Sequence, residues 1–175
     1  MNTNNQIKII KGNLVKLKVD AIVNAADTTL SGGGGIDGVI HRAAGPKLND
    51  ACTKLHGCPT GQAKITPGFN LPAKYIIHTV GPIYKIRTNY DKEAMLKNCY
   101  RNSLNLALQY NLHSIAFPAI STGVYGYPLK NAAYTAYNTV KQWLKQHSDY
   151  DLTVTLCAYD NKTYQYYLKA QGEDN

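Results

Sequence analysis

The 175-residue sequence lacks the features that place a chain in a membrane or export it. It has no apolar run near the roughly 18–20 residues that a membrane-spanning helix needs. Its first ten residues, MNTNNQIKII, do not show the charged-then-apolar order of a signal peptide. No internal repeat, low-complexity tract or linker is visible. We therefore expect one cytoplasmic domain over residues 1–175, without membrane contact, in which residues 169–175 fray.

Cysteines are few and scattered, which argues against a disulfide framework. The sequence has four, Cys52, Cys58, Cys99 and Cys157, and we expect reduced core thiols. Cys52, His56 and Cys58 have the spacing C-x3-H-x-C, but no second pair of zinc ligands lies nearby in the sequence. We expect neither a metal nor a cofactor.

Acidic residues are outnumbered, 11 against 19 Lys and Arg, which gives a net charge of +8 and predicts an anionic partner. Residues 1–87 hold 11 of the basic and 4 of the acidic residues, whereas residues 88–175 hold 8 and 7. Twelve of the 14 tyrosines lie in the second, nearly neutral half. Basic and aromatic residues are therefore not interleaved as in a groove for single-stranded nucleic acid, and we expect only weak electrostatic attraction to nucleic acid.

Short apolar runs alternate with helical patterns along the chain. Strands are predicted over residues 7–11, 21–24, 75–80, 114–118 and 152–158. Helices are predicted over residues 36–44, 46–55, 92–110 and 131–146. This alternation is typical of an α/β layer sandwich with a largely parallel sheet, in which ligands bind beyond the carboxyl ends of the strands.

Four consecutive glycines, Gly32–Gly35, lie between a predicted strand and a predicted helix in NAADTTLSGGGGIDGVIHRAAG. Without Cβ atoms, such a loop brings its N–H groups close to a ligand, and the helix that follows favours an anion. A flexible surface loop is the alternative. The flanking elements and the basic half of the chain favour phosphate binding.

Two familiar phosphate motifs do not fit this loop. Gly33, Gly35 and Gly38 satisfy G-x-G-x-x-G, but no acidic residue lies between Asp50 and Asp91, where a dinucleotide site needs one. No Gly-Lys-Ser/Thr follows the glycines, which excludes a P-loop.

Three polar residues flank the glycines. Asp37 and His41 are four apart, on one face of the predicted helix start, where together they could position and deprotonate a water. Taken singly, Asp37 could serve only to stabilise the helix N-terminus, and His41 could be structural. Asn24, at a strand end, could offer a neutral amide to a sugar hydroxyl.

A second loop, PAISTGVYGYP over residues 118–128, follows another predicted strand. Ser121 and Thr122 offer hydroxyls, Gly123 and Gly126 offer unobstructed N–H groups, and Tyr125 offers a flat ring. Two such loops at strand ends predict a site for a diphosphate held between them. The setting of Ser121 is not G-x-S-x-G, so a serine hydrolase is not expected.

Several motifs together resemble a macro domain of the MacroD type. They are VDAIVNAA, GGGGIDGVIHRAAG, GCPTGQAKIT, LPAKYIIHTVGP and AFPAISTGVYGYP, in the family's order, and the resemblance covers about residues 11–167. It implies a three-layer α/β/α sandwich around a mixed, mostly parallel six-stranded sheet. It also implies a monomer that binds ADP-ribose, removes mono-ADP-ribose from Asp and Glu side chains of modified proteins, and deacetylates O-acetyl-ADP-ribose without a metal.

The resemblance assigns roles by motif position. Asn24, Asp37 and His41 would be catalytic, with Asp37 orienting or activating the attacking water. The residues expected to bind ADP-ribose are Asn13, Leu14, Asp27, Gly33, Gly34, Gly35, Ile36, Ser121, Thr122, Gly123, Val124, Tyr125 and Tyr159.

Two positions depart from the family pattern. Asn13 replaces an Asp that accepts a hydrogen bond from the adenine amino group, and Asp27 replaces the second Asn of NAAN. A carboxylate at Asp27, near Asp37 and a dianionic ligand, should raise the cost of binding. A catalytically weak or silent ADP-ribose reader is therefore the alternative to the hydrolase. A basic nucleic-acid or poly(ADP-ribose) binder and an NAD-dependent oxidoreductase are further alternatives.

Overall fold

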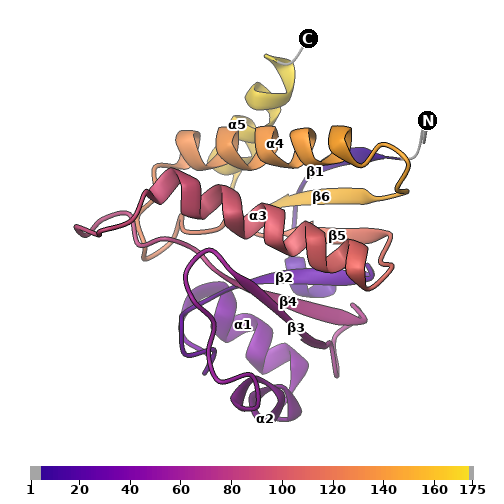
Figure 1. Ribbon diagram of the computed structural model, residues 1–175, viewed down its shortest axis with the longest axis vertical. Helices are drawn as coiled ribbons and strands as arrows, with labels where there is room; N and C mark the ends of the chain where they lie inside the picture. The colour runs from indigo at the N-terminus through magenta and orange to yellow at the C-terminus, as the bar shows by residue number, and fades with distance from the viewer. Residues whose placement is uncertain (1–4, 174–175) are drawn as a thin grey trace.

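The computed structural model describes residues 5–173, in which a six-stranded sheet is combined with five α-helices (Figure 1). Each predicted strand and helix is present, with bounds that differ by a few residues. The elements are β1 (Gln6–Lys11), the short 3-10 helix η1 (Leu14–Lys16), β2 (Ala21–Ala26), α1 (Gly35–Ala44), α2 (Lys47–Thr53), β3 (Ala63–Pro67), β4 (Tyr75–Val80), α3 (Lys92–Gln109), β5 (Ser114–Phe117), α4 (Leu129–Gln146), β6 (Thr153–Ala158) and α5 (Asn161–Gly172).

The sheet is mixed and mostly parallel, as expected. Its strand order is β1-β6-β5-β2-β4-β3, and every neighbouring pair is parallel except β3 and β4. The carboxyl ends of β1, β6, β5, β2 and β4 consequently lie at one edge of the sheet. The loops that leave these ends are the ones that carry most of the predicted site residues.

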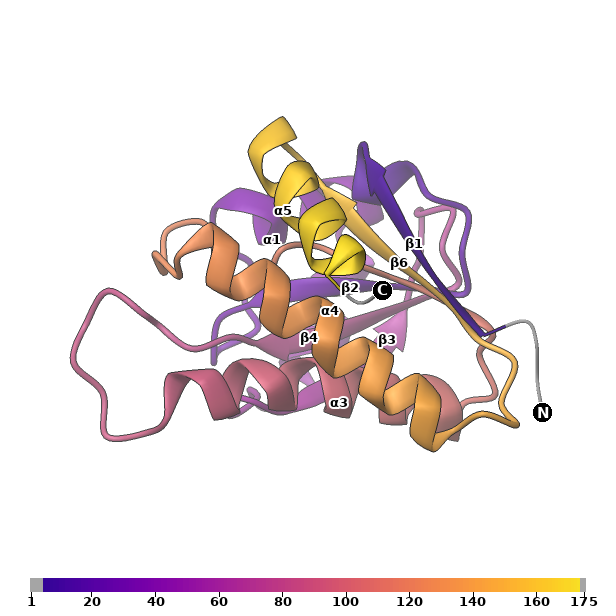
Figure 2. The same cartoon turned by 90° about the horizontal axis from the view of Figure 1, so that it is seen from above.

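Helices cover both faces of the sheet, which confirms the three-layer sandwich (Figures 1 and 2). Side chains of β2 alternate between the faces, because successive residues of a strand point to opposite sides. Ala21 and Val23 join a core formed with α3, α4 and α5. Ile22 and Ala26 join a second core formed with α1, α2 and η1. Among residues 5–173, no helix is both long and apolar enough to cross a bilayer.

Besides the short helix η1, two elements were not predicted. Strand β3 lies at the sheet edge and is mostly half-buried, so its sequence lacks a clear alternating pattern. Helix α5 includes residues 169–172, which were expected to fray. The Asp160 side chain caps α5 by accepting a hydrogen bond from Thr163 N at 2.7 Å, and Tyr167 and Ala170 are buried in the core. This burial holds the end of the helix, whereas residues 174 and 175 lie outside the described range.

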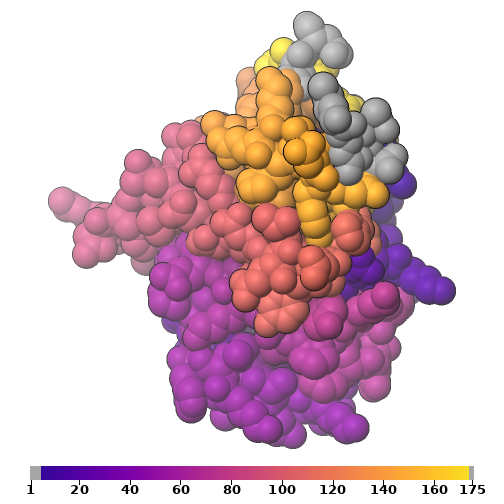
Figure 3. Space-filling model, turned by 45° about the vertical axis from the view of Figure 1, so that its right-hand side comes forward, coloured from indigo at the N-terminus to yellow at the C-terminus, as the bar shows by residue number. Residues whose placement is uncertain are grey.

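The segment between β4 and α3 extends away from the sheet. It forms the long loop at the left of Figure 2 and the projection at the left of Figure 3. Its base is attached to the second predicted site loop, because Tyr84 N and Lys85 N both donate to Tyr125 O, at 2.9 and 3.1 Å. The projection is thereby anchored beside the site edge.

Candidate functional site

The strand pairing brings the predicted site residues to one edge of the sheet. Strand β2 pairs with β5, so the loops over residues 27–34 and 118–128 leave neighbouring strands. Lys11 of β1 pairs with Ala158 of β6, so Asn13 and Tyr159 follow another pair of neighbouring ends. The predicted site residues therefore follow the ends of four adjacent strands. The two loops were predicted from the residues themselves, whereas Asn13 and Tyr159 were predicted from the family resemblance.

The glycine loop is shaped by Asp27 at its beginning. The Asp27 carboxylate accepts hydrogen bonds from Thr29 N at 2.9 Å and Leu30 N at 3.1 Å. Leu30 is buried and anchors the loop. Among residues 5–173, the N–H groups of the segment from Gly34 to Ile36 have no hydrogen-bond partner. These donors at the start of α1 are free, and their binding of an anion stays a prediction.

Asp37 is held in place by two donors. Asn24 Nδ2 donates to one carboxylate oxygen at 2.8 Å, and Gly33 N donates to the other at 2.9 Å. His41 Nε2 lies 3.4 Å from the first oxygen. Asp37 is only 4% exposed. The structure thus brings together Asn24, Asp37 and His41, and Asp37 also ties the glycine loop to its helix.

The second loop differs from prediction in one respect. The Ser121 hydroxyl donates to Pro82 O and the Thr122 hydroxyl donates to Ala119 O, each at 2.8 Å. These hydroxyls therefore hold the protein's own backbone and do not offer their protons to a ligand. Ser121 adopts a φ of 68°, a conformation that few residues other than glycine accept. Within residues 5–173, the N–H groups over residues 123–125 have no partner and remain available.

Tyr125 connects the two loops electrostatically. Burial raises the pKa of Tyr125, and the negative charges of Asp27 and Asp37 raise it further. Its phenol therefore lies close enough to both carboxylates to sense their charge. The loops that carry the free amides over residues 34–36 and 123–125 leave the neighbouring strands β2 and β5.

The other end of the site is more open. The Asn13 side-chain oxygen accepts a hydrogen bond from Val15 N at 3.3 Å and so caps η1. Leu14 is buried, and its side chain packs in the core. The Tyr159 ring is 90% exposed, which leaves its faces free for a planar ligand.

Comparisons with known proteins agree with this geometry. The sequence profile of the Macro domain family matches residues 23–136. This chain belongs to the macro domain family. A macro domain-containing protein of Methanosarcina mazei is 53% identical over 165 residues, which are 94% of this chain and 87% of the relative. Bovine ADP-ribose glycohydrolase MACROD1 is 51% identical over 159 residues, which are 91% of this chain and 49% of that protein. The macro domain described here thus spans about half the length of MACROD1.

Solved macrodomains have the same fold. The Oceanobacillus iheyensis macrodomain with ADP is 42% identical, with a TM-score of 0.92 over 98% of this chain and 92% of that chain. The Trypanosoma brucei macrodomain in complex with ADP-ribose is 43% identical, with a TM-score of 0.87 over 95% of this chain and 69% of that chain.

Sequence reasoning missed His78, which lies behind Asn24 in this macro domain. His78 is fully buried in β4, and burial, followed by the charge of His41, lowers its pKa to about 3. Cys52 lies beside it, with Sγ 3.8 Å from His78 Nε2. Among residues 5–173, no three His, Cys, Asp or Glu side chains are grouped to hold a metal ion. A histidine at a core-facing position of YIIHTV was the available signal.

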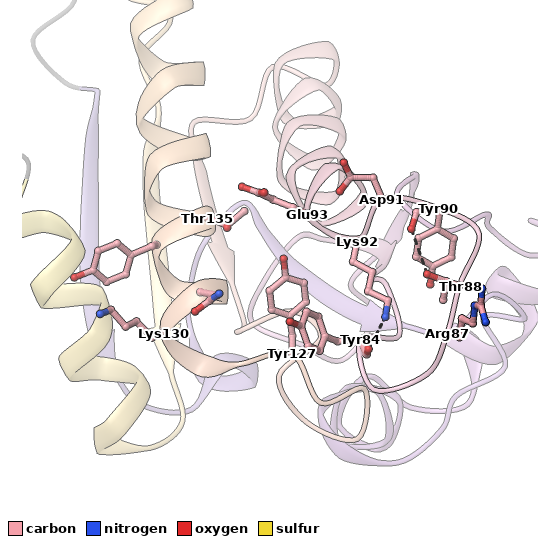
Figure 4. A pocket seen from close by; sticks show the side chains of 12 residues that line it. Tyr84, Arg87, Thr88, Tyr90, Asp91, Lys92, Glu93, Tyr127, Lys130 and Thr135 are labelled. Carbon is pink, nitrogen blue, oxygen red and sulfur yellow. Dashed lines mark hydrogen bonds between the residues drawn. The ribbon is translucent and has the colours of Figure 1, made fainter.

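A separate hollow of about 700 Å³ lies between the start of α3 and the start of α4 (Figure 4). None of the predicted site residues lines it. Both tyrosine rings and basic side chains line this hollow, and the centroids of the Tyr84 and Tyr127 rings are 4.6 Å apart. However, Lys92 Nζ donates to Tyr84 O and Ile86 O, at 2.7 and 2.6 Å, and acidic side chains share the hollow. The absence of a dedicated nucleic-acid groove stays a prediction.

Proposed function

We propose that this macro domain binds ADP-ribose, hydrolyses mono-ADP-ribosyl esters on Asp and Glu side chains of modified proteins, and deacetylates O-acetyl-ADP-ribose. The observation that carries the proposal is the buried Asp37 carboxylate, held by Asn24 and Gly33 beside two groups of unpartnered backbone amides. A module that only binds the ligand needs the amides, whereas hydrolysis also needs a group that acts on a water. The glycohydrolase relatives and the ligands of the solved macrodomains support the proposal.

The donors at this edge of the sheet support an arrangement of the ligand in the proposed complex. The diphosphate accepts hydrogen bonds from the amides over residues 34–36 and 123–125, because oriented N–H groups at a helix start bind anions. The distal ribose then lies near Asn24 and Tyr125. The adenine lies at the opposite end, between Asn13 and the exposed Tyr159 ring.

Asp37 has the position to act on a water. Hydrolysis joins the water oxygen to C1 of the distal ribose, while the ester oxygen leaves with the bonding electrons as a carboxylate and one proton is released. A carboxylate that orients this water and accepts its proton lowers the barrier. Neither carboxylate oxygen is saturated, since each has about two acceptor positions. His41 Nε2 lies 3.4 Å from one carboxylate oxygen, where a protonated ring would stabilise the carboxylate charge.

Release of ADP-ribose from a protein modified on glutamate tests the proposal. The native protein should release it, and Asp37→Ala should abolish release, because no other carboxylate in the site is held by Asn24. Asp50→Ala is the matched control, since Asp50 is also in the first turn of a helix but is exposed on α2. Equal release by Asp37→Ala and the native protein would contradict the catalytic role.

Two further arms separate the alternatives. Calorimetry with ADP-ribose distinguishes the hydrolase from the reader, because tight binding without release would identify a reader. Parallel incubations with Ser-linked and Arg-linked ADP-ribose and with O-acetyl-ADP-ribose test the linkage. We expect release of ADP-ribose from the glutamate-linked protein and from O-acetyl-ADP-ribose, which are the two esters. Release from only the Ser or Arg linkage would refute the proposed specificity for esters.

A further inference from the structure

The proposed mechanism makes no use of His78, although His78 contacts one of its residues. Asn24 of β2 and His78 of β4 are partners in the parallel register, so their side chains lie side by side on the sheet face covered by α1 and α2. Asn24 Nδ2 lies 3.1 Å from His78 Nδ1, and Thr66 Oγ1 of β3 lies 2.9 Å from His78 Nε2. Asn24 and His78 are fully buried, and Thr66 is 4% exposed.

These contacts determine where the His78 proton lies. Asn24 Nδ2 can only donate, so His78 Nδ1 must present its lone pair and carry no hydrogen. The proton of the neutral ring is therefore on Nε2, where Thr66 Oγ1 accepts it. Cys52 Sγ, at 3.8 Å from Nε2, is a much weaker partner than the Thr66 oxygen at 2.9 Å.

The orientation of the Asn24 amide follows from the same contacts. One Nδ2 hydrogen is used by Asp37 at 2.8 Å and the other by His78. A flipped amide would set its oxygen against the Asp37 carboxylate, where two acceptors repel each other. In the observed orientation, Asn24 Oδ1 is a buried acceptor without a partner among the described residues. Burying such an acceptor without a hydrogen bond costs free energy, which a donor from a ligand would offset.

We propose that His78, supported by Thr66, is a positioning residue that fixes the Asn24 amide so that Oδ1 accepts a hydrogen bond from a hydroxyl of the distal ribose. The inference rests on the proposed function, because the ribose is the hydroxyl donor. His78 does not touch the ligand itself. It confers selectivity for ligands that carry the distal ribose over ADP, which lacks that sugar.

Calorimetry with ADP-ribose and ADP separates this role from general damage. His78→Leu removes the acceptor for Asn24 Nδ2, so ADP-ribose should bind about tenfold more weakly, while ADP affinity changes less than about twofold. His78→Asn can present an amide oxygen at the position of Nδ1 and should restore most of the ADP-ribose affinity. Thr66→Val, which keeps the shape of Thr66 but removes the proton acceptor, should weaken ADP-ribose binding in the same direction.

Nitrogen NMR of the native protein gives a readout that needs no variant. The ¹⁵N shifts of the His78 ring should identify a neutral ring protonated at Nε2 between pH 5.5 and 8, and protonation at Nδ1 would overturn the inference. Equal weakening of both ligands by His78→Leu, or of neither, would also overturn it. Failure of the native protein to bind ADP-ribose would instead refute the proposed function, and the inference with it.

Discussion

Gly38 provides a test of whether the site depends on the exact position of the glycine loop. Gly38 is buried in α1, and a Cβ added there would lie 2.5 Å from Gly33 O and 3.1 Å from Arg42 Nη1. Real Cβ atoms essentially never approach closer than 3.0 Å, so Gly38→Ala requires a displacement of at least 3.0 − 2.5 = 0.5 Å. The Arg42 side chain is flexible and can move away. Gly33 is backbone, and it must shift.

We expect the glycine loop, and not helix α1, to move when this methyl group is added. Helix α1 is anchored by Ile40 and Ala44, which are 0% and 1% exposed, whereas Gly33 is exposed. A shift of Gly33 stretches its 2.9 Å bond to Asp37 and displaces the neighbouring free amides. Misplacement by about 1 Å can reduce a rate by about 100-fold, so we expect Gly38→Ala to slow ADP-ribose release by roughly 10- to 100-fold.

Stability should fall only modestly in the same variant. Alanine is favoured over glycine inside a helix by about 1 kcal/mol, and losing a hydrogen bond to a charged group costs about 1.5–3 kcal/mol. The net loss of about 0.5–2 kcal/mol corresponds to a Tm decrease of roughly 1–8 °C for a domain of this size. Release kinetics and thermal unfolding measure the two effects.

Gly172→Ala is the control. It adds the same methyl group at the end of α5, where nothing lies within 4 Å of the new Cβ, and should leave the release rate unchanged without lowering the Tm. A native rate in Gly38→Ala would refute the argument that contact with α1 sets the loop position.

Three further predictions concern charge, stacking and pH. Asp27→Asn keeps an oxygen for Thr29 N but removes the charge facing the diphosphate, so calorimetry should show ADP-ribose binding about fivefold tighter, and unchanged or weaker affinity would count against it. Tyr159→Ala should weaken binding by about 1–3 kcal/mol, by analogy with base stacking, and leave Tm unchanged, because the ring is 90% exposed; an unaltered Kd would exclude the stack. Folding lowers the pKa of His78 from 6.5 to about 3, so the unfolded chain takes up a proton at acidic pH that the folded protein excludes. Urea unfolding should therefore show about 2 kcal/mol less stability at pH 5 than at pH 7.5, and a smaller loss in His78→Asn. An equal loss in the native protein and in His78→Asn would assign the pH dependence to another group.

The sequence predicted the fold where local signals were strong. The glycine run, the apolar strands and the amphipathic helices each have a pattern that is visible within about ten residues. Helix α5 was missed because its buried residues, such as Tyr167 and Ala170, are separated by polar ones and become a core face only against α4 and the sheet. Strand β3 was missed because an edge strand that is half-buried lacks a strict alternation.

The candidate site likewise combines residues that local sequence predicted with contacts that it could not predict. The sequence predicted Asn24, Asp37 and His41, because strand end, loop and helix follow one another along the chain. The His78 contact depends on the pairing of β2 with β4 in one particular register, which links residues 54 apart. Likewise, the Ser121 hydroxyl donates to Pro82 O and the Thr122 hydroxyl donates to Ala119 O only once the loop is folded. Such partners are properties of the packing and leave no local pattern.

Asp37 has two roles in the proposed site. It accepts a hydrogen bond from Gly33 N and so shapes the loop, and it presents a carboxylate to the proposed water. Asp37→Ala removes both, whereas Gly38→Ala keeps the carboxylate and displaces the loop. If loop position alone determined the rate, the two variants would be equally slow. A much greater loss in Asp37→Ala would support a contribution of the carboxylate to the chemistry beyond its part in holding the glycines.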